Sequence, residues 1–440
     1  MKKKILLFLA VLALVMAFSG CGTFEVDTEA LMTPPSLTEE QTRLNSALVR
    51  VIGENFRLQY PNGDGSSSAF MFSDLDGDGS EEALAFYTLD NENTRINILR
   101  KKEDDWVSTY EAAGFSGDIQ NVRFMEAGKE RLLVVQWNQE AGVYRFKDDR
   151  LETLYSSLCD GILTADLSGD GTGDLLIFSN AYSGRAGVRL IYQEKGEIFV
   201  TEMVDVNAQY GTIYSTVCGP LGDGRIGYFI DSNPYQNLYL TEILTLENGK
   251  LCRFTLADFI PYVPEETEEK ESGVTIVTHY GPRGIYARNT AAFCADVNGD
   301  GVIEMPLEMR EDPATQENTD YFYLQYIRYD GTETEPVWTG FFEDTEAFGF
   351  AFPEEWTENV KISRDGGTKE YRFTEKESGA EVLRLKITTP SDFQDHFEEG
   401  YMLAGQNETR AIAVLPLADP ESPWYLEPFT VKERFSFIKH

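Results

Sequence analysis

The stretch Asp74-Leu-Asp76-Gly-Asp78-Gly-Ser-Glu-Glu82 recurs in outline twice more along this 440-residue chain, and it decides the expected fold. The other copies are Asp166-Leu-Ser168-Gly-Asp170-Gly-Thr-Gly-Asp174 and Asp296-Val-Asn298-Gly-Asp300-Gly-Val-Ile-Glu304. All three follow D-x-[DNS]-x-D-G-x-x-[DE], with side-chain oxygens at positions 1, 3, 5 and 9 and glycine at position 6. Together with the carbonyl of position 7, these oxygens would surround a hard cation, and calcium is its natural identity.

The loops differ from EF-hand loops in two ways. Position 12 holds no glutamate, and the flanking segments are short apolar runs rather than amphipathic helices. A strand-loop-strand calcium site is therefore expected. A single copy could equally be a polar Asp-Gly turn in a hairpin. Three copies, each between two apolar runs, favour the metal site.

These residues resemble the FG-GAP/VCBS repeats of integrin-like β-propellers, in which the loop joins two strands of one blade. The resemblance implies three sets of Ca²⁺ ligands: Asp74, Asp76, Asp78 and Glu82; Asp166, Ser168, Asp170 and Asp174; Asp296, Asn298, Asp300 and Glu304. Ser168 departs from the usual Asp or Asn at position 3, so the second site is expected to be the weakest.

Two degenerate copies of the template lie between the intact ones, at 122–135 and 215–230. Both keep the strand-turn-strand outline without the ligands, so they should bind no metal. The first two intact loops start 92 residues apart with one degenerate copy between them, which gives a repeat of about 46 residues. The next interval is 130 residues, so an insertion or a further blade must fill part of it.

Short strand-like segments separated by Gly, Asn and Asp turns fill the region between the loops. At about 46 residues per blade, 38–335 would form a mainly β fold, a β-propeller of about six blades, with five or seven also open. A closed ring would protect nearly every sheet edge. A helix with Thr38 as its cap is expected to precede the ring, over 38–52.

The N-terminus has the pattern of an export signal. Three lysines, the apolar run 5–18 and the small residues before Cys21 occur in the order of a signal peptide over 1–20. The segment 19–21 resembles a bacterial lipobox, which implies lipid attachment at Cys21 and a polar tether over 21–37. An ordinary cleaved signal with an incidental cysteine is the alternative.

The region 336–440 has a different texture and is expected to be a separate α+β domain. Its opening, Phe350-Ala-Phe-Pro-Glu-Glu-Trp356, has a short similarity to PsbP-like domains of exported bacterial proteins. A terminal helix is expected between Pro423 and Phe435.

The chain is strongly acidic, with 74 Asp and Glu against 38 Lys and Arg and a formal net charge of −36. This balance argues against nucleic acid as a partner, because nucleic acids need a basic surface. Four cysteines follow Cys21 without a C-x-x-C motif. Free structural thiols are expected at Cys218 and Cys294, while one disulfide among the four stays open.

The whole layout resembles the VCBS/FG-GAP repeat lipoproteins of anaerobic Gram-positive bacteria, which implies a lipid-anchored protein on the extracytoplasmic face of the membrane. The three histidines are scattered, and no G-x-S-x-G, H-E-x-x-H or P-loop motif occurs. A non-catalytic binding or adhesion module for a protein, peptide or glycan is therefore the main expectation. The alternative is a glycan- or peptide-active enzyme that uses carboxylates in the propeller channel.

Overall fold

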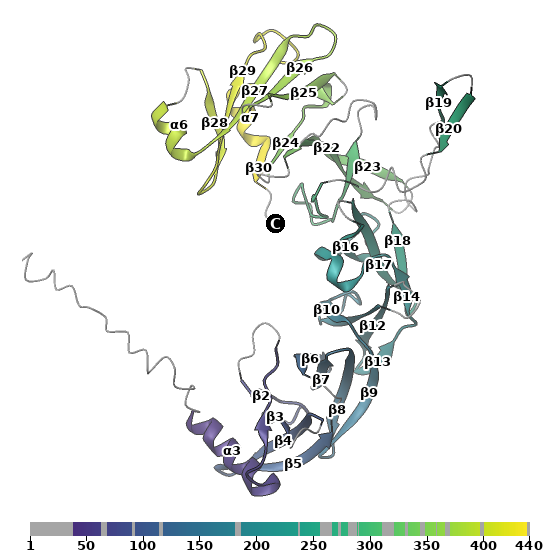
Figure 1. Ribbon diagram of the computed structural model, residues 1–440, viewed down its shortest axis with the longest axis vertical. Helices are drawn as coiled ribbons and strands as arrows, with labels where there is room; N and C mark the ends of the chain where they lie inside the picture. The colour runs from purple at the N-terminus through teal and green to yellow at the C-terminus, as the bar shows by residue number, and fades with distance from the viewer. Residues whose placement is uncertain are drawn as a thin grey trace, which may run out of the picture.

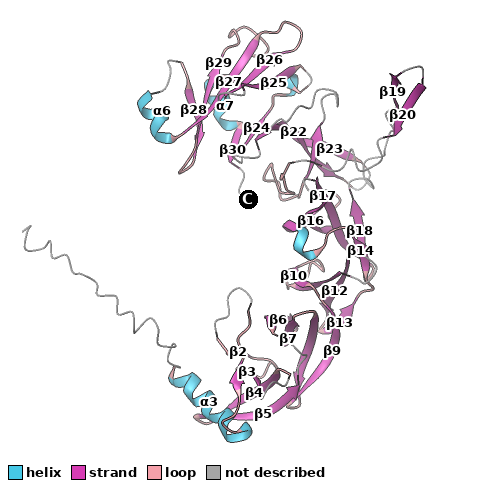
Figure 2. Ribbon diagram, viewed as in Figure 1, coloured by secondary structure: helices cyan, strands magenta, loops and turns pink. Residues whose placement is uncertain are grey.

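Strands dominate the protein in the computed structural model (Figures 1 and 2). The structure describes residues 38–437 except 63–67, 90–92, 114–117, 181–185, 236–237, 256–265, 272–273, 280–287, 289, 310–320, 331–332, 344–347, 358, 366–369 and 397–399. The predicted signal peptide, Cys21 and the tether lie outside the described residues. Within them the fold is mainly β, with several antiparallel sheets.

Four successive sheets are antiparallel meanders built to one plan. The first contains β2 (Phe70–Ser73), β3 (Glu82–Thr88), β4 (Arg95–Lys102) and β5 (Asp105–Ala113), and β1 (Arg57–Leu58) also pairs with β3. The second contains β6 (Ile119–Ala127), β7 (Glu130–Trp137), β8 (Glu140–Lys147) and β9 (Arg150–Leu158). The third contains β10 (Gly161–Ala165), β11 (Asp174–Asn180), β12 (Ala186–Glu194), β13 (Glu197–Val200) and β14 (Val204–Val206). The fourth contains β15 (Ile213–Pro220), β16 (Ile226–Tyr235), β17 (Leu238–Glu247) and β18 (Lys250–Thr255).

Two five-stranded sheets follow towards the C-terminus. The fifth contains β21 (Met305–Met309), β22 (Tyr321–Tyr329), β23 (Thr334–Glu343), β24 (Phe348–Ala351) and β30 (Phe435–Phe437). The C-terminal sheet contains β25 (Val360–Asp365), β26 (Glu370–Glu375), β27 (Glu381–Thr388), β29 (Ala411–Pro416) and β28 (Met402–Gln406), accompanied by α6 (Pro390–His396) and α7 (Pro428–Glu433). In the sequence, the hairpin of β19 (Glu266–Glu271) and β20 (Val274–His279) comes between the fourth and fifth sheets. It accounts for part of the 130-residue interval between the second and third acidic loops.

The sheets stack face to face, and each contributes to two apolar cores. In β3, Ala83 and Ala85 belong to the core shared with the N-terminal helix, whereas Leu84 and Phe86 belong to the core shared with the second sheet. The side chains of β7 alternate in the same way between the first and third sheets. Similar cores join the third sheet to the fourth and the fourth to the fifth. Because strands such as β3 and β7 are buried on both faces, their sequences are nearly unbroken apolar runs.

Both ends of this stack are covered. The helix α3 (Glu39–Ile52) packs Leu44, Ala47 and Leu48 against the outer face of the first sheet. At the other end, Phe341 and Phe350 of the fifth sheet share a core with the C-terminal sheet. The sheets follow an open arc in Figure 1, and no closed ring is found in the described part of the chain. Covered end faces remove the apolar surface that would otherwise drive the first and fifth sheets together.

The predicted helix cap is confirmed. The Thr38 hydroxyl accepts a hydrogen bond from the Gln41 amide at 3.2 Å, and the Gln41 side chain accepts one from the Thr38 amide at 3.0 Å. This reciprocal pair satisfies two amide groups at the start of α3. Gly53 ends the helix with φ of 83°, a conformation that glycine adopts without strain.

Three further expectations have outcomes here. The boundary expected near residue 335 lies inside β23, which pairs with β22, so the fifth sheet takes strands from both sides of it and the domain division remains a prediction. The terminal helix predicted from Pro423 was too long, because a turn precedes Pro428 and the chain after Arg434 pairs with β24. All four described cysteines are free thiols.

Candidate metal centres

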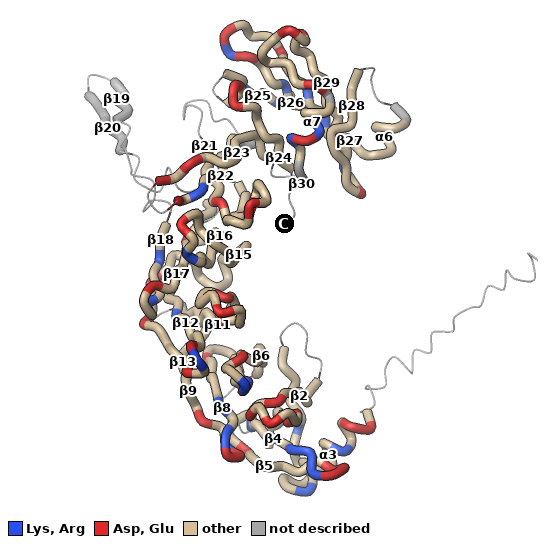
Figure 3. Tube along the Cα trace, turned by 180° about the vertical axis from the view of Figure 1, so that it is seen from behind, with Lys and Arg blue, Asp and Glu red and all other residues tan. Residues whose placement is uncertain are grey.

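The three acidic loops occupy equivalent places in alternate sheets. The first connects β2 to β3, and the second connects β10 to β11. The third precedes β21, and its ends are joined by a bridge between Ala295 and Glu304. The two degenerate copies are the β6–β7 and β15–β16 turns of the sheets in between. In Figure 3 acidic segments recur along the arc.

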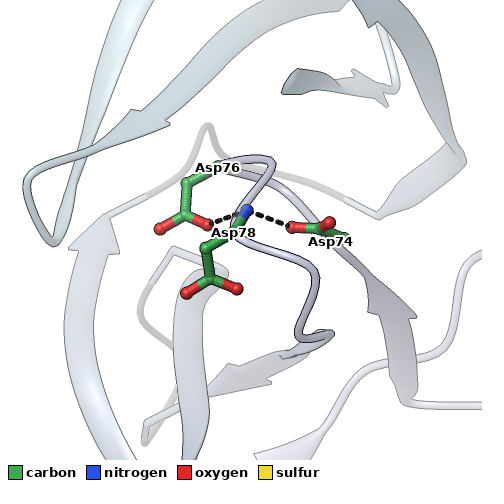
Figure 4. A group of neighbouring side chains, drawn as sticks. All are labelled: Asp74, Asp76 and Asp78. Carbon is green, nitrogen blue, oxygen red and sulfur yellow. Dashed lines mark hydrogen bonds between the residues drawn. The ribbon is translucent and has the colours of Figure 1, made fainter. Parts of the chain in front are cut away.

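Each loop folds around the carboxylate at its first position. In the first loop, Asp74 Oδ1 accepts hydrogen bonds from the amides of Gly77 at 2.9 Å and Asp78 at 3.1 Å. Its Oδ2 accepts one from the Gly79 amide at 3.0 Å. Figure 4 shows the Asp78 amide between the carboxylates of Asp74 and Asp76, to which it donates at 3.1 and 3.2 Å. These bonds hold the chain in a tight turn with its carboxylates grouped together.

The same pattern recurs in the other two loops. Asp166 accepts from the amides of Asp170 at 3.0 Å and Gly171 at 2.9 Å. Asp296 accepts from three amides: Gly299 at 2.7 Å, Asp300 at 3.1 Å and Gly301 at 2.9 Å. The carboxylate at position 5 accepts from the amide two residues later in every loop, at 2.7, 2.8 and 2.9 Å. A motif found in the sequence therefore has one conformation in three places.

Glycines at positions 4 and 6 make this conformation possible. All six have positive φ, between 73° and 91°, where a side chain would strain the backbone. At Gly77 a side chain would also collide with the neighbouring repeat, since an added Cβ would lie 2.6 Å from the Lys129 carbonyl oxygen.

The carboxylate at position 9 is buried in every loop. Glu82 is 1% exposed, and Asp174 and Glu304 are 0% exposed. Each accepts a hydrogen bond at 2.9 Å from the amide of position 2, contributed by Leu75, Leu167 and Val297. Burial raises the pKa of Glu82 to about 7 and that of Asp174 to about 6, and it also raises the pKa of Glu304. In the third loop, Glu304 Oε1 has no hydrogen-bond partner among the residues that the structure describes. A buried carboxylate oxygen without a partner is costly unless a cation binds it.

The side chains of the first loop converge on one point. Asp74, Asp76 and Asp78 each offer an oxygen, and these three oxygens lie within 4.8 Å of one another. Calcium binds six to eight oxygens at about 2.3–2.6 Å, so its ligands are spaced about this far apart. In the second loop the Ser168 hydroxyl donates to Asp174 Oδ1 at 3.2 Å, which leaves an oxygen lone pair but no charge at position 3.

Side chains from the second strand after each loop also contact these loops, and sequence reasoning missed them. Arg100 on β4 forms ion pairs with Asp76 and Glu82, and Arg328 on β22 forms one with Asp300. In the second loop the neutral amide of Gln193 on β12 donates to Asp170. Strand register is the signal that locates the arginines, because Ala83 pairs with Leu99 and Met305 with Ile327, which places Arg100 and Arg328 opposite position 9.

The degenerate turns hold no comparable group. In the β15–β16 turn, Asp223 is occupied by Arg225, with 2.7 Å between its Oδ2 and the arginine Nε. No other cluster of three or more His, Cys, Asp or Glu side chains with ligand atoms in reach occurs among the residues that the structure describes.

Comparisons with known proteins add no assignment. A scan against protein-family models finds no match, and a search of curated proteins finds no similar sequence. Among the described helices, none is both long and apolar enough to cross a membrane.

Proposed function

We propose that this protein is a calcium-binding repeat protein, anchored by lipid to the extracytoplasmic face of the cell membrane, that acts as a non-catalytic binding or adhesion module. The observation that carries the proposal is the repeated loop geometry: a first aspartate enclosed by backbone amides, a position-5 carboxylate that accepts from the amide two residues later, and a buried carboxylate at position 9. In the first loop the oxygens of Asp74, Asp76 and Asp78 are also grouped within 4.8 Å. Glu304 Oε1 is buried and has no hydrogen-bond partner in the described part of the chain, which supports a bound cation at this position.

Calcium is the cation that this donor set favours. Every candidate side chain contributes oxygen, and none contributes nitrogen or sulfur, which zinc and most transition metals prefer. Magnesium needs a near-ideal octahedron at shorter distances and usually retains several waters, whereas calcium accepts irregular sites of six to eight oxygens. The loops would supply Asp or Glu at most positions, Asn298 or Ser168 at position 3 of two loops, and the carbonyl of position 7.

The resemblance to FG-GAP/VCBS repeats supports the same proposal. Antiparallel sheets of four or five strands, each with its first turn at the template position, fit what such repeats would form. Closure of these sheets into a propeller of about six blades remains a prediction. Small-angle X-ray scattering would test it, since a closed ring has a smaller radius of gyration than an arc of the same chain.

A location outside the cytoplasm is proposed from the N-terminal pattern, in which Cys21 would carry the lipid. A polar tether would separate the folded sheets from the membrane. The partner would be an extracellular protein, peptide or glycan rather than nucleic acid, because the formal net charge of −36 opposes binding to a polyanion.

Isothermal titration of the purified protein with CaCl₂ tests the metal assignment. We expect three sites, or two if Ser168 makes the second loop too weak. Asp74→Asn and Asp296→Asn should each remove one site, whereas Asp223→Asn, in a degenerate turn, should remove none. A native protein that binds no calcium, or that loses as much binding through Asp223→Asn as through Asp74→Asn, would contradict the proposal.

A second experiment tests the binding role. The protein would be used in a pull-down from extracellular material and on a glycan array, each with calcium and with a chelator. Retention of a partner only with calcium supports a binding module, whereas turnover of a glycan or peptide supports the enzyme alternative.

A further inference from the structure

Arg100 occupies the place where a cation would neutralise the first loop. Its guanidinium forms ion pairs with Asp76 and with Glu82, the latter at 3.2 Å between Nε and Oε1. Two predicted metal ligands are therefore paired with the same arginine. Since the arginine side chain is only 26% exposed, its charge lies close to the loop rather than in bulk water.

Arg328 holds a similar place in the third loop. Its Nη1 lies 2.8 Å from Asp300 Oδ2, a predicted ligand at position 5. The same guanidinium also pairs with Glu335, which is not a predicted ligand. At the second loop the corresponding contact comes from the neutral side chain of Gln193.

We propose that Arg100 and Arg328 are tethered counter-cations, which neutralise the first and third loops in the absence of metal and which calcium must displace. This inference rests on the proposed calcium sites and adds a rule for their affinity. An arginine near the ligands stabilises the empty loop and repels the incoming ion, so it weakens calcium binding while it keeps the metal-free loop folded.

Each arginine has an acidic partner outside its loop to receive it when calcium enters. Arg100 Nη1 lies 3.5 Å from Asp149 Oδ1 in the β8–β9 turn, and the guanidinium carbon lies 5.2 Å from the centre of the Phe146 ring on β8. Arg328 has Glu335 on β23. When calcium displaces either arginine, its charge therefore still has an acidic partner. Separating a fully buried ion pair would instead leave an uncompensated buried charge.

The number of ligands held predicts the size of each effect. Arg100 pairs with two predicted ligands and Arg328 with one, so removal of Arg100 should change calcium affinity more. A unit charge about 6 Å from a divalent ion, in a water-like dielectric, alters the binding constant about tenfold.

Arg145 provides a matched control. It lies on β8, the third strand of the second sheet, and its Nε is 2.9 Å from Glu130 Oε2 at the start of β7. Arg145 thus has the same place in the second sheet as Arg100 has in the first. The β6–β7 turn of the second sheet, however, lacks the acidic ligands. Arg145→Gln removes an equivalent ion pair whose acidic partner, Glu130, is not a proposed metal ligand.

The test measures calcium affinity and metal-free stability in the same variants of the full chain. Asp166→Asn with Asp296→Asn leaves only the first loop, and Asp74→Asn with Asp166→Asn leaves only the third. In these backgrounds R100Q should lower the calcium Kd about tenfold, and R328Q should lower it by a smaller factor. Both should also lower the melting temperature in chelator, whereas R145Q should lower that temperature and leave the Kd unchanged.

The direction in which the calcium Kd changes distinguishes this role from a structural one. An arginine that only supports the fold would weaken calcium binding when removed, so an unchanged or higher Kd in both R100Q and R328Q overturns the inference. If a variant folds only with calcium, titration of the loaded protein with a chelator gives the same constant. A parent chain that binds no calcium refutes the proposed sites themselves, which is a distinct result.

Discussion

Replacement of Arg288 by Met should destabilise the protein and loosen the third loop in particular. Arg288 and Asp231 are each 1% exposed, and Arg288 Nη2 lies 2.5 Å from Asp231 Oδ1. The same guanidinium donates to the Ala292 carbonyl at 2.7 Å and to the Thr241 hydroxyl at 2.8 Å. These bonds attach the segment before Asp296 to the fourth sheet, so they fix the entry of the chain into the third loop.

The size of the effect follows from what the substitution leaves behind. Methionine fills much of the arginine volume but leaves a buried carboxylate without its cation, which costs about 3–5 kcal/mol. Asp231 keeps hydrogen bonds from the Thr241 hydroxyl at 2.6 Å and the Cys294 amide at 2.7 Å. We therefore expect the lower end of that range, about 3 kcal/mol. Arg288→Met combined with Asp231→Asn should recover more than half of the loss, because no uncompensated charge then remains.

Guanidinium denaturation followed by tryptophan fluorescence measures the change, and calcium titration of the third loop measures its local consequence. Arg225→Met is the control, since Arg225 forms ion pairs at 2.7 and 2.5 Å but its side chain is 32% exposed. Pairs of that kind contribute about 0–1 kcal/mol. An Arg288→Met protein within 0.5 kcal/mol of the native one, with unchanged calcium binding in the third loop, would refute the reasoning, because a buried pair should cost several times more.

Three further predictions follow from the loops and the N-terminus. Calcium at a hundredfold excess over Kd should stabilise the fold by about 2.7 kcal/mol per site, so a chelator should lower the melting temperature. Asp300→Asn should reduce that shift, whereas Asp223→Asn should not. A melting curve that does not change with chelator would show that the loops are only turns. Gly77→Ala should cost more than about 1 kcal/mol, since it adds strain at φ of 74° and a contact of 2.6 Å with Lys129, and denaturation by urea would detect it; a neutral substitution would contradict the packing described. Cys21→Ser should abolish incorporation of a labelled fatty acid, and equal labelling of both forms would exclude the lipid anchor.

The sequence predicted what depends on neighbouring residues. The acidic template located the first turn of alternate sheets, its degenerate copies located the turns between them, and Thr38 correctly marked the start of α3. These features depend on side chains and backbone amides a few positions apart, so a pattern is enough to find them.

Contacts between distant residues could not be predicted in this way. The pairing of β30 with β24 and the ion pair between Arg288 and Asp231 join segments far apart in the chain. The open arc could not be predicted for a similar reason. A repeat pattern predicts each sheet but does not determine the angle between successive sheets. Whether the end faces of such a stack meet each other or another element depends on the whole chain, and here α3 and the C-terminal sheet cover them.

The alternation of acidic loops with ligand-free turns also has a packing basis. The Arg131 amide in the second sheet donates to the Leu75 carbonyl of the first loop at 3.2 Å. In the fourth sheet, the Cys218 thiol donates to the Asp166 carbonyl of the second loop at 3.4 Å, and the Pro220 carbonyl accepts from the Ile303 amide of the third loop at 3.0 Å. Each ligand-free turn therefore supports an acidic loop next to it. A second acidic loop in that place would set carboxylates against carboxylates across the junction, so the loss of ligands in alternate repeats reduces repulsion between neighbouring sheets.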